Sequence, residues 1–522
     1  MTTSQIHVDR EGFDTSGITR GADGVLHYDG LPPSVPAMLR AQAERRPGTE
    51  AVVETGGGPR LTYRELWDRA RRVAGGLREA GVRRGDRVAI RLGNGADWVV
   101  GFFGALTAGA LAVPVNTRFT EAEARYVVED SGAAHVLNPG EPLPDGEPYE
   151  EPGLRLSDPA AIFYTSGTTG FPKGAVTTHE NFLSNCETCR RVMDYGGGSG
   201  SSAQEGLRTL VSVPLFHVTG CNSQLLFLCY LGGTTVVMPA FEVRAFLRAI
   251  EEERVNLLTS VPSIYWLALN RPEFADTDVS SVTKLSYGGA PIAPDLVARL
   301  REGFPNARLG NGFGLTETSA VATFLPDEYA AEHADTVGFP APVCEVRVDG
   351  TDPDGVGELL VRGPNVVAGY WNKPEATAAA FTADRWLRTG DLARIDEHGL
   401  VRIVDRAKDM INRGGENVYC VEVENALAGA PGVYEAAVVG VPDPVMGEKV
   451  GAVLVPQPGT SIDVPAVIAH LRERIADFKV PQFVAVREEP LPRNPGGKIL
   501  KRPLREGAAW APVAGDSRKK DR

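Results

Sequence analysis

The sequence predicts an α/β protein with a large N-terminal domain, residues 1–405, and a small α+β C-terminal domain, residues 406–522. Three observations support this. The chain has 522 residues, more than one hydrophobic core usually organises. Short apolar runs alternate with helical stretches over most of its length, which is typical of parallel sheets covered by helices. Beyond Asp405 the pattern changes to shorter, mixed elements.

The elements of the large domain follow from local signals. The first thirty or so residues are rich in Gly and Asp and are expected to be loosely ordered. Thr62 and Glu65 form a capping box at the start of a helix. Strands are expected at the apolar runs RVAIRL, AHVLN, AAIFYTS, TLVSVPL, TTVVMP, NLLTSVP and TKLSYGG. Ligands of such sheets bind in the loops after the carboxyl ends of strands.

Residues 98–115 carry no charge and are about long enough to span a bilayer. Gly101, Gly104, Gly109 and Pro114 interrupt this stretch, and its end reads as a short buried strand. We therefore predict a buried helix followed by a parallel strand, and no transmembrane segment.

The small domain is expected to contain the strands EAAVVGV, KVGAVLV and FVAVRE. It should also contain one helix. That helix carries Val464, Val467, Ile468, Leu471 and Ile475 on one face. The tail from Ala511 is expected to be disordered, and residues 196–206 are expected to form a flexible surface loop.

Composition limits the classes of partner. The net charge of -13 argues against nucleic-acid or membrane-surface binding, both of which favour a basic face. Six cysteines do not make a disulfide framework in a chain of this length, and Cys186 and Cys189 are expected to be semi-buried thiols on a helix. The N-terminus shows no signal peptide, so the expected location is the cytoplasm. The oligomeric state stays open between monomer and homodimer.

A loop dense in Gly, Ser and Thr, residues 164–174, follows the apolar strand AAIFY. Glycine lets backbone N–H groups approach a polyphosphate, hydroxyl groups add donors, and Lys173 supplies a positive charge. The loop is not the usual P-loop, because Gly174 follows Lys173 where Ser or Thr would stand. A flexible surface turn is the alternative. The density of phosphate-binding residue types directly after a buried strand favours an ATP site.

Five further motifs follow in order: YGGA at 287–290, NGFGLTE at 311–317, TGD at 389–391, VDRAKD at 404–409 and PRNPGGK at 492–498. With the loop at 164–174, this series resembles the adenylate-forming superfamily of acyl- and aryl-CoA synthetases, luciferases and peptide-synthetase adenylation domains. The resemblance extends from about Pro33 to Arg502. It implies a barrel-like subdomain in the large domain and a mobile C-terminal domain that turns about a hinge near Lys408.

The resemblance implies a site for Mg·ATP. The residues it assigns to the phosphates are Thr165, Ser166, Gly167, Thr168, Thr169, Gly170 and Lys173. Those assigned to adenine and ribose are Gly288, Gly289, Ala290, Asn311, Gly312, Phe313, Asp391 and Arg406. Phe313, where many members have Tyr, offers a flat face for adenine, and Thr316 can donate to a phosphate oxygen. Glu317 and Thr168 are the expected magnesium ligands.

The same resemblance assigns Lys498, His217, Thr316 and Glu317 to catalysis, with Lys498 bridging the attacking carboxylate and the α-phosphate. The residues it assigns to the acyl pocket are His217, Gly220, Cys221, Ser223, Tyr265 and Gly314, and those assigned to a CoA tunnel are Gly414, Gly415 and Glu416. His217 is expected to be a wall or gate of the pocket. Taken alone, it could equally be a satisfied core histidine, and Lys498 in its glycine-rich loop a solvated lysine.

These assignments predict an ATP-dependent acid–CoA ligase. A small-molecule carboxylic acid would attack Mg·ATP to give an acyl adenylate and pyrophosphate, and CoA would then displace AMP. The expected co-substrates and cofactor are ATP, CoA and Mg²⁺. The alternatives are delivery of the acyl group to a carrier protein or an amine, and a non-catalytic ATP-binding protein. The segment around His217 lacks a charged partner, which suggests a mainly apolar fatty, aromatic or polycyclic acid.

Overall fold

The computed structural model describes residues 12–165, 172–195, 206–290, 292–414, 416–493 and 499–513. The chain forms two compact units. The first contains residues 1–347, 360–389 and 396–401, and the second contains residues 348–359, 390–395 and 402–522. The last crossing between the units is between Val401 and Arg402, whereas the sequence placed a single boundary after Asp405.

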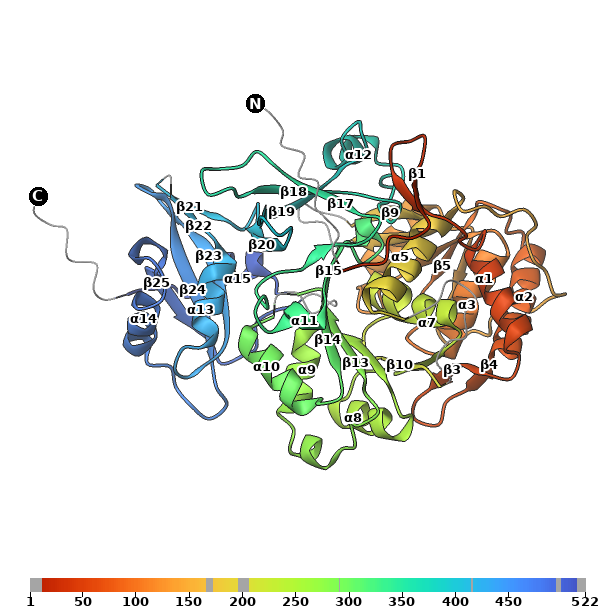
Figure 1. Ribbon diagram of the computed structural model, residues 1–522, viewed down its shortest axis with the longest axis horizontal. Coiled ribbons are helices and arrows are strands. Elements are labelled where there is room, and N and C mark those ends of the chain that lie inside the picture. Colours follow the sequence, from red (N-terminus) through yellow and green to blue (C-terminus); the bar gives the residue numbers. More distant parts are fainter. Residues whose placement is uncertain are drawn as a thin grey trace, which may run out of the picture. The chain divides into compact units, whose positions relative to one another are not determined.

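Two large sheets build the first unit (Figure 1). The nine-stranded sheet is parallel across its centre, from β14 to β3, and antiparallel at both edges. In order across this sheet, its strands are β16 (Phe339–Pro340), β15 (Thr323–Leu325), β14 (Arg308–Phe313), β13 (Lys284–Gly288), β12 (Leu257–Ser260), β10 (Arg208–Val211), β11 (Thr234–Val237), β3 (Glu50–Glu54) and β4 (Arg60–Thr62). The five-stranded sheet consists of β7 (His135–Leu137), β5 (Arg87–Ile90), β6 (Leu111–Pro114), β8 (Pro159–Thr165) and β9 (Lys173–Thr178). In that sheet only the β8–β9 pair is antiparallel.

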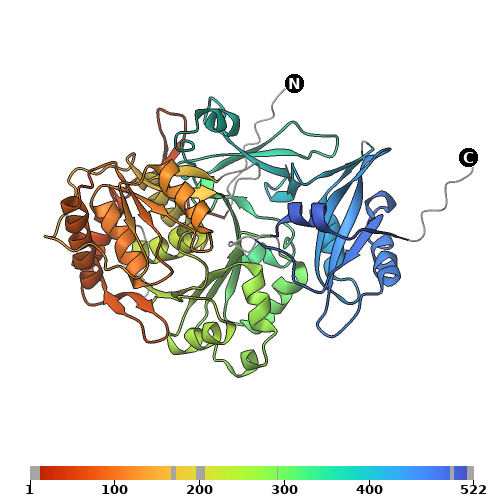
Figure 2. The ribbon, with the colours of Figure 1, turned by 180° about the vertical axis from the view of Figure 1, so that it is seen from behind.

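Helices cover both faces of each sheet, as the alternating pattern predicts. Val88 and Ile90 of β5 point into a core shared with the nine-stranded sheet, whereas Ala89 points to the opposite face. The helices of the shared core are α1 (Val35–Arg45), α2 (Tyr63–Glu79), α3 (Ala96–Thr107), α5 (His179–Val192) and α7 (Phe227–Leu231). The outer faces carry α4 (Glu121–Ser131) on the smaller sheet and α8 (Val243–Glu252), α9 (Pro262–Leu269) and α10 (Pro294–Gly303) on the larger (Figure 2).

The uncharged stretch at residues 98–115 forms a buried helix and strand, as predicted. Helix α3 is buried along nearly its whole length, and β6 pairs in parallel with β5 and β8. No helix in the described part of the chain has both the length and the apolar character that a bilayer crossing requires. The helix predicted from Thr62 is α2, and its capping box is formed by Thr62 and Glu65.

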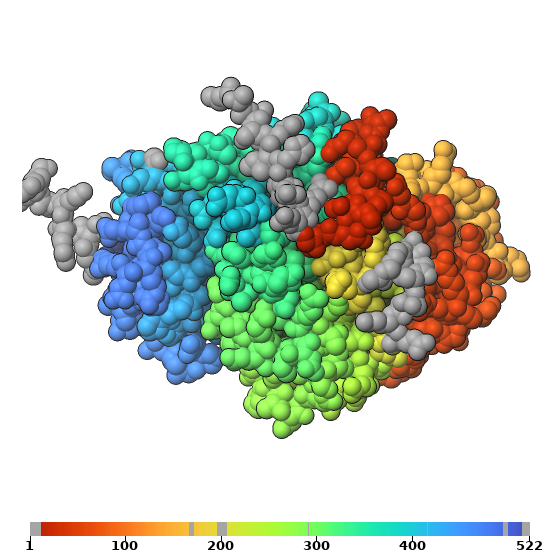
Figure 3. Space-filling view, viewed as in Figure 1, coloured from red at the N-terminus to blue at the C-terminus, as the bar shows by residue number. Residues whose placement is uncertain are grey.

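The expectation of a loosely ordered N-terminus is wrong for the residues described there. Strands β1 (Ile18–Arg20) and β2 (Leu26–Tyr28) form an antiparallel hairpin on the surface of the first unit (Figure 3). Arg20 forms an ion pair with Glu345 at 2.8 Å, and the Tyr28 hydroxyl hydrogen-bonds Thr188 at 2.9 Å. These contacts come from distant segments, so the local composition does not reveal them.

The second unit is a small α+β structure. Its sheet contains β22 (Glu416–Val418), β21 (Ile411–Arg413), β24 (Gly447–Pro456), β25 (Phe483–Val486) and β26 (Ala511–Pro512), and β23 (Val433–Asp443) also pairs with β24. Its helices are α13 (Cys420–Ala428), α14 (Val464–Arg472) and α15 (Lys501–Gly507). A further sheet, β17 (Glu345–Asp349), β18 (Gly357–Arg362), β19 (Leu387–Ile395) and β20 (Val401–Arg406), contributes segments to both units.

Three smaller expectations need correction. Helix α14 ends at Arg472, so Ile475 lies beyond it, although Ile475 still packs on the same core. The predicted disordered tail begins with β26, which pairs with β25. Cys186 and Cys189 lie on α5 as fully buried free thiols, because both face the shared core. The surface loop predicted at residues 196–206 lies, except for Gly206, outside the described residues.

Candidate active site

Two of the predicted nucleotide motifs lie at the carboxyl ends of neighbouring parallel strands. Strand β13 ends at Gly288 and β14 ends at Phe313, and Gly288 lies opposite Gly312 in the register of this pair. A Cβ atom on Gly288 would lie 2.2 Å from the carbonyl oxygen of Gly312, so only glycine fits there. The structure therefore brings these residues together at the edge where parallel sheets bind ligands.

The other residues assigned to adenine differ in their surroundings. Gly289 has a left-handed φ of 73° and is exposed, and Ala290 after it is partly exposed. The ring of Phe313 is also partly exposed, as a stacking face requires. Asn311 is buried, and its amide Nδ2 donates to the carbonyl oxygen of Thr336 at 3.0 Å. The Asn311 side chain therefore supports the loop structure.

The loop between β14 and β15 carries Thr316 and Glu317. The 3-10 turn η3 (Thr316–Thr318) is followed by Ser319 and Ala320, which have φ angles of 51° and 106°. Such angles cost residues other than glycine roughly 1–3 kcal/mol each. Gly314 makes the turn feasible, because a Cβ atom there would lie 1.3 Å from the carbonyl oxygen of Ala320.

Three buried asparagines from distant elements hold this turn. Asn185 on α5 accepts a hydrogen bond from the backbone N–H of Val321 at 3.0 Å. Asn222 donates to the carbonyl oxygen of Ser319 at 2.9 Å. Asn365 donates to two further carbonyl groups of the turn, each at 3.0 Å. These bonds offset the backbone strain and fix the position of Glu317. None of these asparagines lies in a motif that marks it in the sequence.

Glu317 and Lys173 both contact Tyr370, another residue outside the motifs that mark the site in the sequence. The Tyr370 hydroxyl donates to Glu317 Oε1 at 2.7 Å, and Lys173 Nζ lies 4.7 Å from the centre of the Tyr370 ring. Burial and the nearby Glu317 carboxylate raise the pKa of Tyr370, so the phenol stays a donor. The available signal was a Gly-Tyr pair in a loop after a strand, which is weak without a structure.

The predicted phosphate loop is described only at its two ends. Thr165 ends β8 and Lys173 begins β9, and the two residues pair across the hairpin. The Thr165 hydroxyl lies 3.4 Å from the carbonyl oxygen of Lys173. The other predicted phosphate residues lie outside the described residues: Ser166, Gly167, Thr168, Thr169 and Gly170. The magnesium role predicted for Thr168 therefore stays a prediction.

The residue types present fit a magnesium ion held mainly by substrate. No group of three or more His, Cys, Asp or Glu side chains within the described ranges is arranged to hold a metal. Mg²⁺ usually needs only one or two protein carboxylates when it also binds phosphate oxygens. Glu317 offers such a carboxylate on a partly exposed turn. This arrangement suits a metal that arrives with ATP.

Four of the six predicted acyl-pocket residues lie on or beside a π-helical turn: His217, Gly220, Cys221 and Ser223. His217 precedes the short helix α6 (Val218–Gly220), which continues into the π-helix η1 (Cys221–Leu226). Such turns are frequent at functional sites. A Cβ atom on Gly220 would lie 2.4 Å from the carbonyl oxygen of Pro214, so glycine is needed for close packing. Cys221 and Ser223 lie within η1 and are buried.

Tyr265 of α9 lies in the core on the outer face of the nine-stranded sheet. It is fully buried, and its hydroxyl donates to the carbonyl oxygen of Ser286 at 2.8 Å. His217 contacts the ring of Phe216 at 4.8 Å, and its buried Nε2 atom has no hydrogen-bond partner in the described part of the chain. Burial lowers the pKa of His217 to about 4. A neutral imidazole at neutral pH suits a pocket wall better than a general acid.

The His217 pKa leads to a testable stability prediction. In an unfolded chain the pKa is close to 6.5, so the unfolded state binds a proton first as the pH falls. Stability should therefore decrease as the pH drops from about 6.5 to 4, by about 3 kcal/mol at most from this residue. We expect His217→Gln to lose less stability than wild type over this range in denaturant unfolding. The exposed His398→Gln is the control; equal pH dependence in both variants would contradict the prediction.

In the second unit, Asp391 and Arg406 form a close ion pair. Asp391 on β19 is almost fully buried, and its Oδ1 lies 2.7 Å from Arg406 Nε at the end of β20. Lys408 follows two residues later and is partly buried, which lowers its pKa. The structure thus brings the predicted ribose residues together, two residues before the predicted hinge.

The predicted CoA-tunnel residues follow β21. Gly414 has a φ of 63°, and a Cβ atom there would lie 2.5 Å from the Met446 side chain. The exposed Glu416 forms an ion pair at 3.5 Å with Arg413, whose side chain is partly buried. Gly415 and Lys498 lie outside the described residues, so the assignments of both stay predictions.

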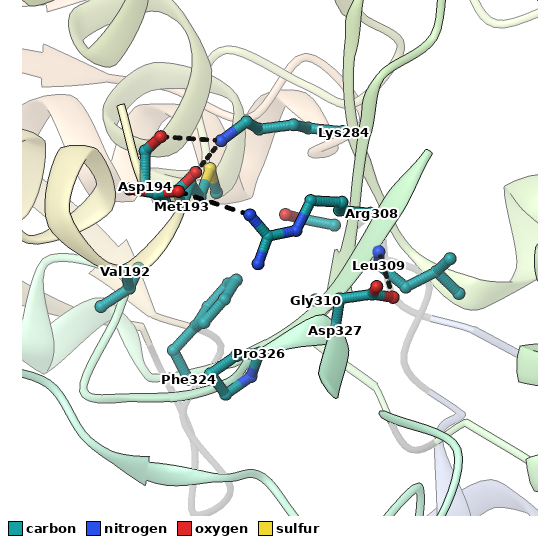
Figure 4. Close-up of a pocket in the computed structure, with 11 residues that line it drawn as sticks. Val192, Met193, Asp194, Lys284, Arg308, Leu309, Gly310, Phe324, Pro326 and Asp327 are labelled. Carbon is teal, nitrogen blue, oxygen red and sulfur yellow. Dashed lines mark hydrogen bonds and ion pairs between the residues drawn. The ribbon is translucent and has the colours of Figure 1, made fainter. Parts of the chain in front are cut away.

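A small cavity of about 30 Å³ lies at the amino ends of β13 and β14 (Figure 4). Lys284 and Arg308 point toward Asp194 (Figure 4). Lys284 Nζ donates to the carbonyl oxygen of Asp194 at 3.1 Å, and the Arg308 guanidinium lies 3.4 Å from its carboxylate. Phe324 and Asp327 complete this side of the cavity. It contains none of the predicted site residues and lies at the strand ends opposite the glycine-rich motifs, so it is separate from the candidate site.

Comparison with known proteins shows to which family the chain belongs. The profile of the AMP-binding enzyme family matches residues 39–148 and 138–371. The profile of the AMP-binding enzyme C-terminal domain matches residues 422–498. The chain therefore belongs to the AMP-binding enzyme family, and the resemblance to the adenylate-forming superfamily is confirmed.

Relatives extend over nearly the whole chain. A feruloyl-CoA synthase from Amycolatopsis sp is 39% identical and covers 86% of this chain and 94% of its own. The long-chain-fatty-acid–CoA ligase FadD13 of Mycobacterium tuberculosis is 35% identical and covers 90% and 97%. The o-succinylbenzoate CoA synthetase MenE of Bacillus subtilis, solved with its acyl-adenylate intermediate, is 30% identical, has a TM-score of 0.80 and covers 91% and 98%. The predicted α/β fold class is confirmed.

Proposed function

We propose that the protein is an ATP-dependent carboxylic acid–CoA ligase. The observation that carries this proposal is the pair of charges at Tyr370, where Glu317 and Lys173 lie on separate motifs but contact one residue. A carboxylate for Mg²⁺ beside an ammonium for phosphate oxygens suits the triphosphate of ATP. The names of the relatives, which include a feruloyl-CoA synthase and a long-chain-fatty-acid–CoA ligase, support CoA as the acceptor.

The proposed reaction has two steps. A carboxylate oxygen attacks the α-phosphorus of ATP, and the bond from that phosphorus to the bridging oxygen breaks to release pyrophosphate. The thiol sulfur of CoA then attacks the acyl carbon, AMP leaves, and the thiol proton passes to solvent. Lys498 would stabilise the charge that develops at the α-phosphate in the first step, and Lys408 would be the hinge between steps.

We propose that the acid has a mainly apolar fatty, aromatic or polycyclic body. The residues proposed for its pocket include His217, which is neutral at neutral pH, and the uncharged side chains of η1. A buried pocket without a fixed charge favours an apolar ligand with a single terminal carboxylate. The names of the relatives include both a fatty and an aromatic acyl group, so the class of acid needs an experiment.

The test is a panel of carboxylic acids assayed for pyrophosphate release with ATP and Mg²⁺, followed by CoA addition. Ferulic acid, fatty acids of graded length and a polycyclic acid cover the proposed range. We expect acid-dependent pyrophosphate release and formation of the acyl thioester with CoA alone. Adenylate formation without thioester would favour a carrier protein or an amine as acceptor. No pyrophosphate release with any acid would contradict the proposed function.

A further inference from the structure

We propose that Tyr370 is a positioning residue that orients Glu317 and Lys173 and keeps these two charges from neutralising each other. This inference rests on the proposed function, because that function needs both charges for Mg²⁺ and pyrophosphate. The phenol hydroxyl donates to Glu317 Oε1 at 2.7 Å, and the ring lies 4.7 Å from Lys173 Nζ. A single side chain thus contacts the anion through its tip and the cation through its ring.

The two charges remain available to a ligand. Among the residues that the structure describes, neither Lys173 nor Glu317 forms an ion pair with an oppositely charged side chain. A direct Lys173–Glu317 ion pair would weaken the binding of a metal and a phosphate, because that pair would have to break first. A contact with an aromatic ring holds an ammonium more weakly than a buried carboxylate does. The Tyr370 ring therefore holds Lys173 near Glu317 and leaves the ammonium charge available to a phosphate oxygen.

The backbone around Tyr370 joins the two motifs. The N–H of Trp371 donates to the carbonyl oxygen of Gly174 at 2.7 Å, directly after Lys173. The N–H of Val367 donates to the carbonyl oxygen of Glu317 at 2.9 Å. The short segment from Val367 to Trp371 therefore bonds to the end of the phosphate hairpin and to the turn that carries Glu317. Tyr370 lies within this segment, and the segment's backbone bonds hold the Lys173 and Glu317 motifs beside it.

Tyr149 provides a matched control. Its hydroxyl donates to Glu151 at 2.5 Å, and the guanidinium of Arg78 lies 4.0 Å from the centre of its ring. It makes the same two kinds of contact as Tyr370, but with residues that none of the site motifs contains, and its hydroxyl also accepts a hydrogen bond from Arg78. Tyr149→Phe therefore removes the same atom from a similar pair of contacts outside the candidate site.

The experiment compares Tyr370→Phe, Tyr149→Phe and wild type in two measurements across a range of Mg²⁺ concentrations. The first is calorimetric ATP binding, and the second is acid-dependent exchange of pyrophosphate into ATP. We expect Tyr370→Phe to need about tenfold more Mg²⁺ for half-saturation, since a hydrogen bond to a charged group is lost. Tyr149→Phe should match wild type. Tyr370→Leu should also raise the KM for ATP, because Lys173 loses the ring.

The outcomes separate the inference from the proposed function. An unchanged Mg²⁺ requirement in Tyr370→Phe, or an equal shift in Tyr149→Phe, would overturn the role of Tyr370. Wild-type protein that binds Mg·ATP but exchanges no pyrophosphate would contradict the proposed function. The Mg²⁺ dependence of ATP binding in the variants would still test the role of Tyr370. If Tyr370→Phe does not fold, a comparison of Tyr370→His with Tyr370→Leu tests the role of Tyr370. The histidine keeps a ring and a donor, so it should restore part of the Mg²⁺ affinity that the leucine loses.

Discussion

Lys498→Ala should slow acyl-adenylate formation severely while preserving the transfer of a supplied acyl adenylate to CoA. The physical reason is that negative charge accumulates around the α-phosphorus in the first step only. Loss of one positioned charge of this kind typically slows a reaction by about 100-fold to 1,000-fold. The measurement is pyrophosphate release for the first step, and thioester formation from synthetic acyl adenylate for the second.

Lys479→Ala is the matched control for this experiment. Lys479 belongs to the same unit, precedes the glycine-rich motif of Lys498 in sequence and pairs with Glu422 at 2.7 Å. It should leave both half-reactions unchanged. Normal pyrophosphate release by Lys498→Ala would show that the assignment of this lysine is wrong. Equal loss of both half-reactions would indicate a general role in CoA or nucleotide binding.

Local patterns predicted most of the fold because they report on short-range physics. The Thr62–Glu65 capping box marks the start of α2, since both partners of the box lie within one helical turn. Gly109, with a left-handed φ of 75°, lies where the apolar stretch divides into α3 and β6, whereas Gly101 and Gly104 lie inside α3. Helix caps and glycine breaks of this kind do not depend on which distant segments pack nearby.

The contacts that position the candidate site could not be predicted in the same way. Tyr370 meets Glu317 across 53 residues of chain, and Asn185 meets Val321 across 136. An asparagine or a tyrosine in a loop has many ordinary roles, and its partner is set only by tertiary packing. The motifs therefore predicted which residues bear the chemistry, whereas the structure shows which residues hold them in place.

Gly314 illustrates how the two levels combine. The resemblance to the adenylate-forming superfamily assigns it to the acyl pocket. The structure adds a strict packing requirement, because the missing Cβ makes room for the carbonyl oxygen of Ala320. Its φ does not lie in the left-handed region, so the requirement for glycine at this position comes from space alone.

Gly314→Ala should therefore destabilise the protein strongly. The added methyl would lie 1.3 Å from a backbone atom, which cannot move aside as a flexible side chain could. We expect a loss of at least about 3 kcal/mol in the free energy of unfolding, measured by denaturant titration. Gly48→Ala is the control, since Gly48 is exposed and a Cβ there meets nothing within 4 Å.

The same substitution should remove adenylation beyond what lost stability explains. Displacing the carbonyl of Ala320 disturbs the turn that Asn222 and Asn365 hold, and that turn carries Glu317. At a temperature where Gly314→Ala is still folded, we expect pyrophosphate release to fall by about 100-fold, the size of effect that misplaced catalytic groups cause. If the folded variant adenylates at the wild-type rate, the turn does not control Glu317. If its unfolding midpoint equals that of Gly48→Ala, the close approach of Gly314 to Ala320 is not required for the fold.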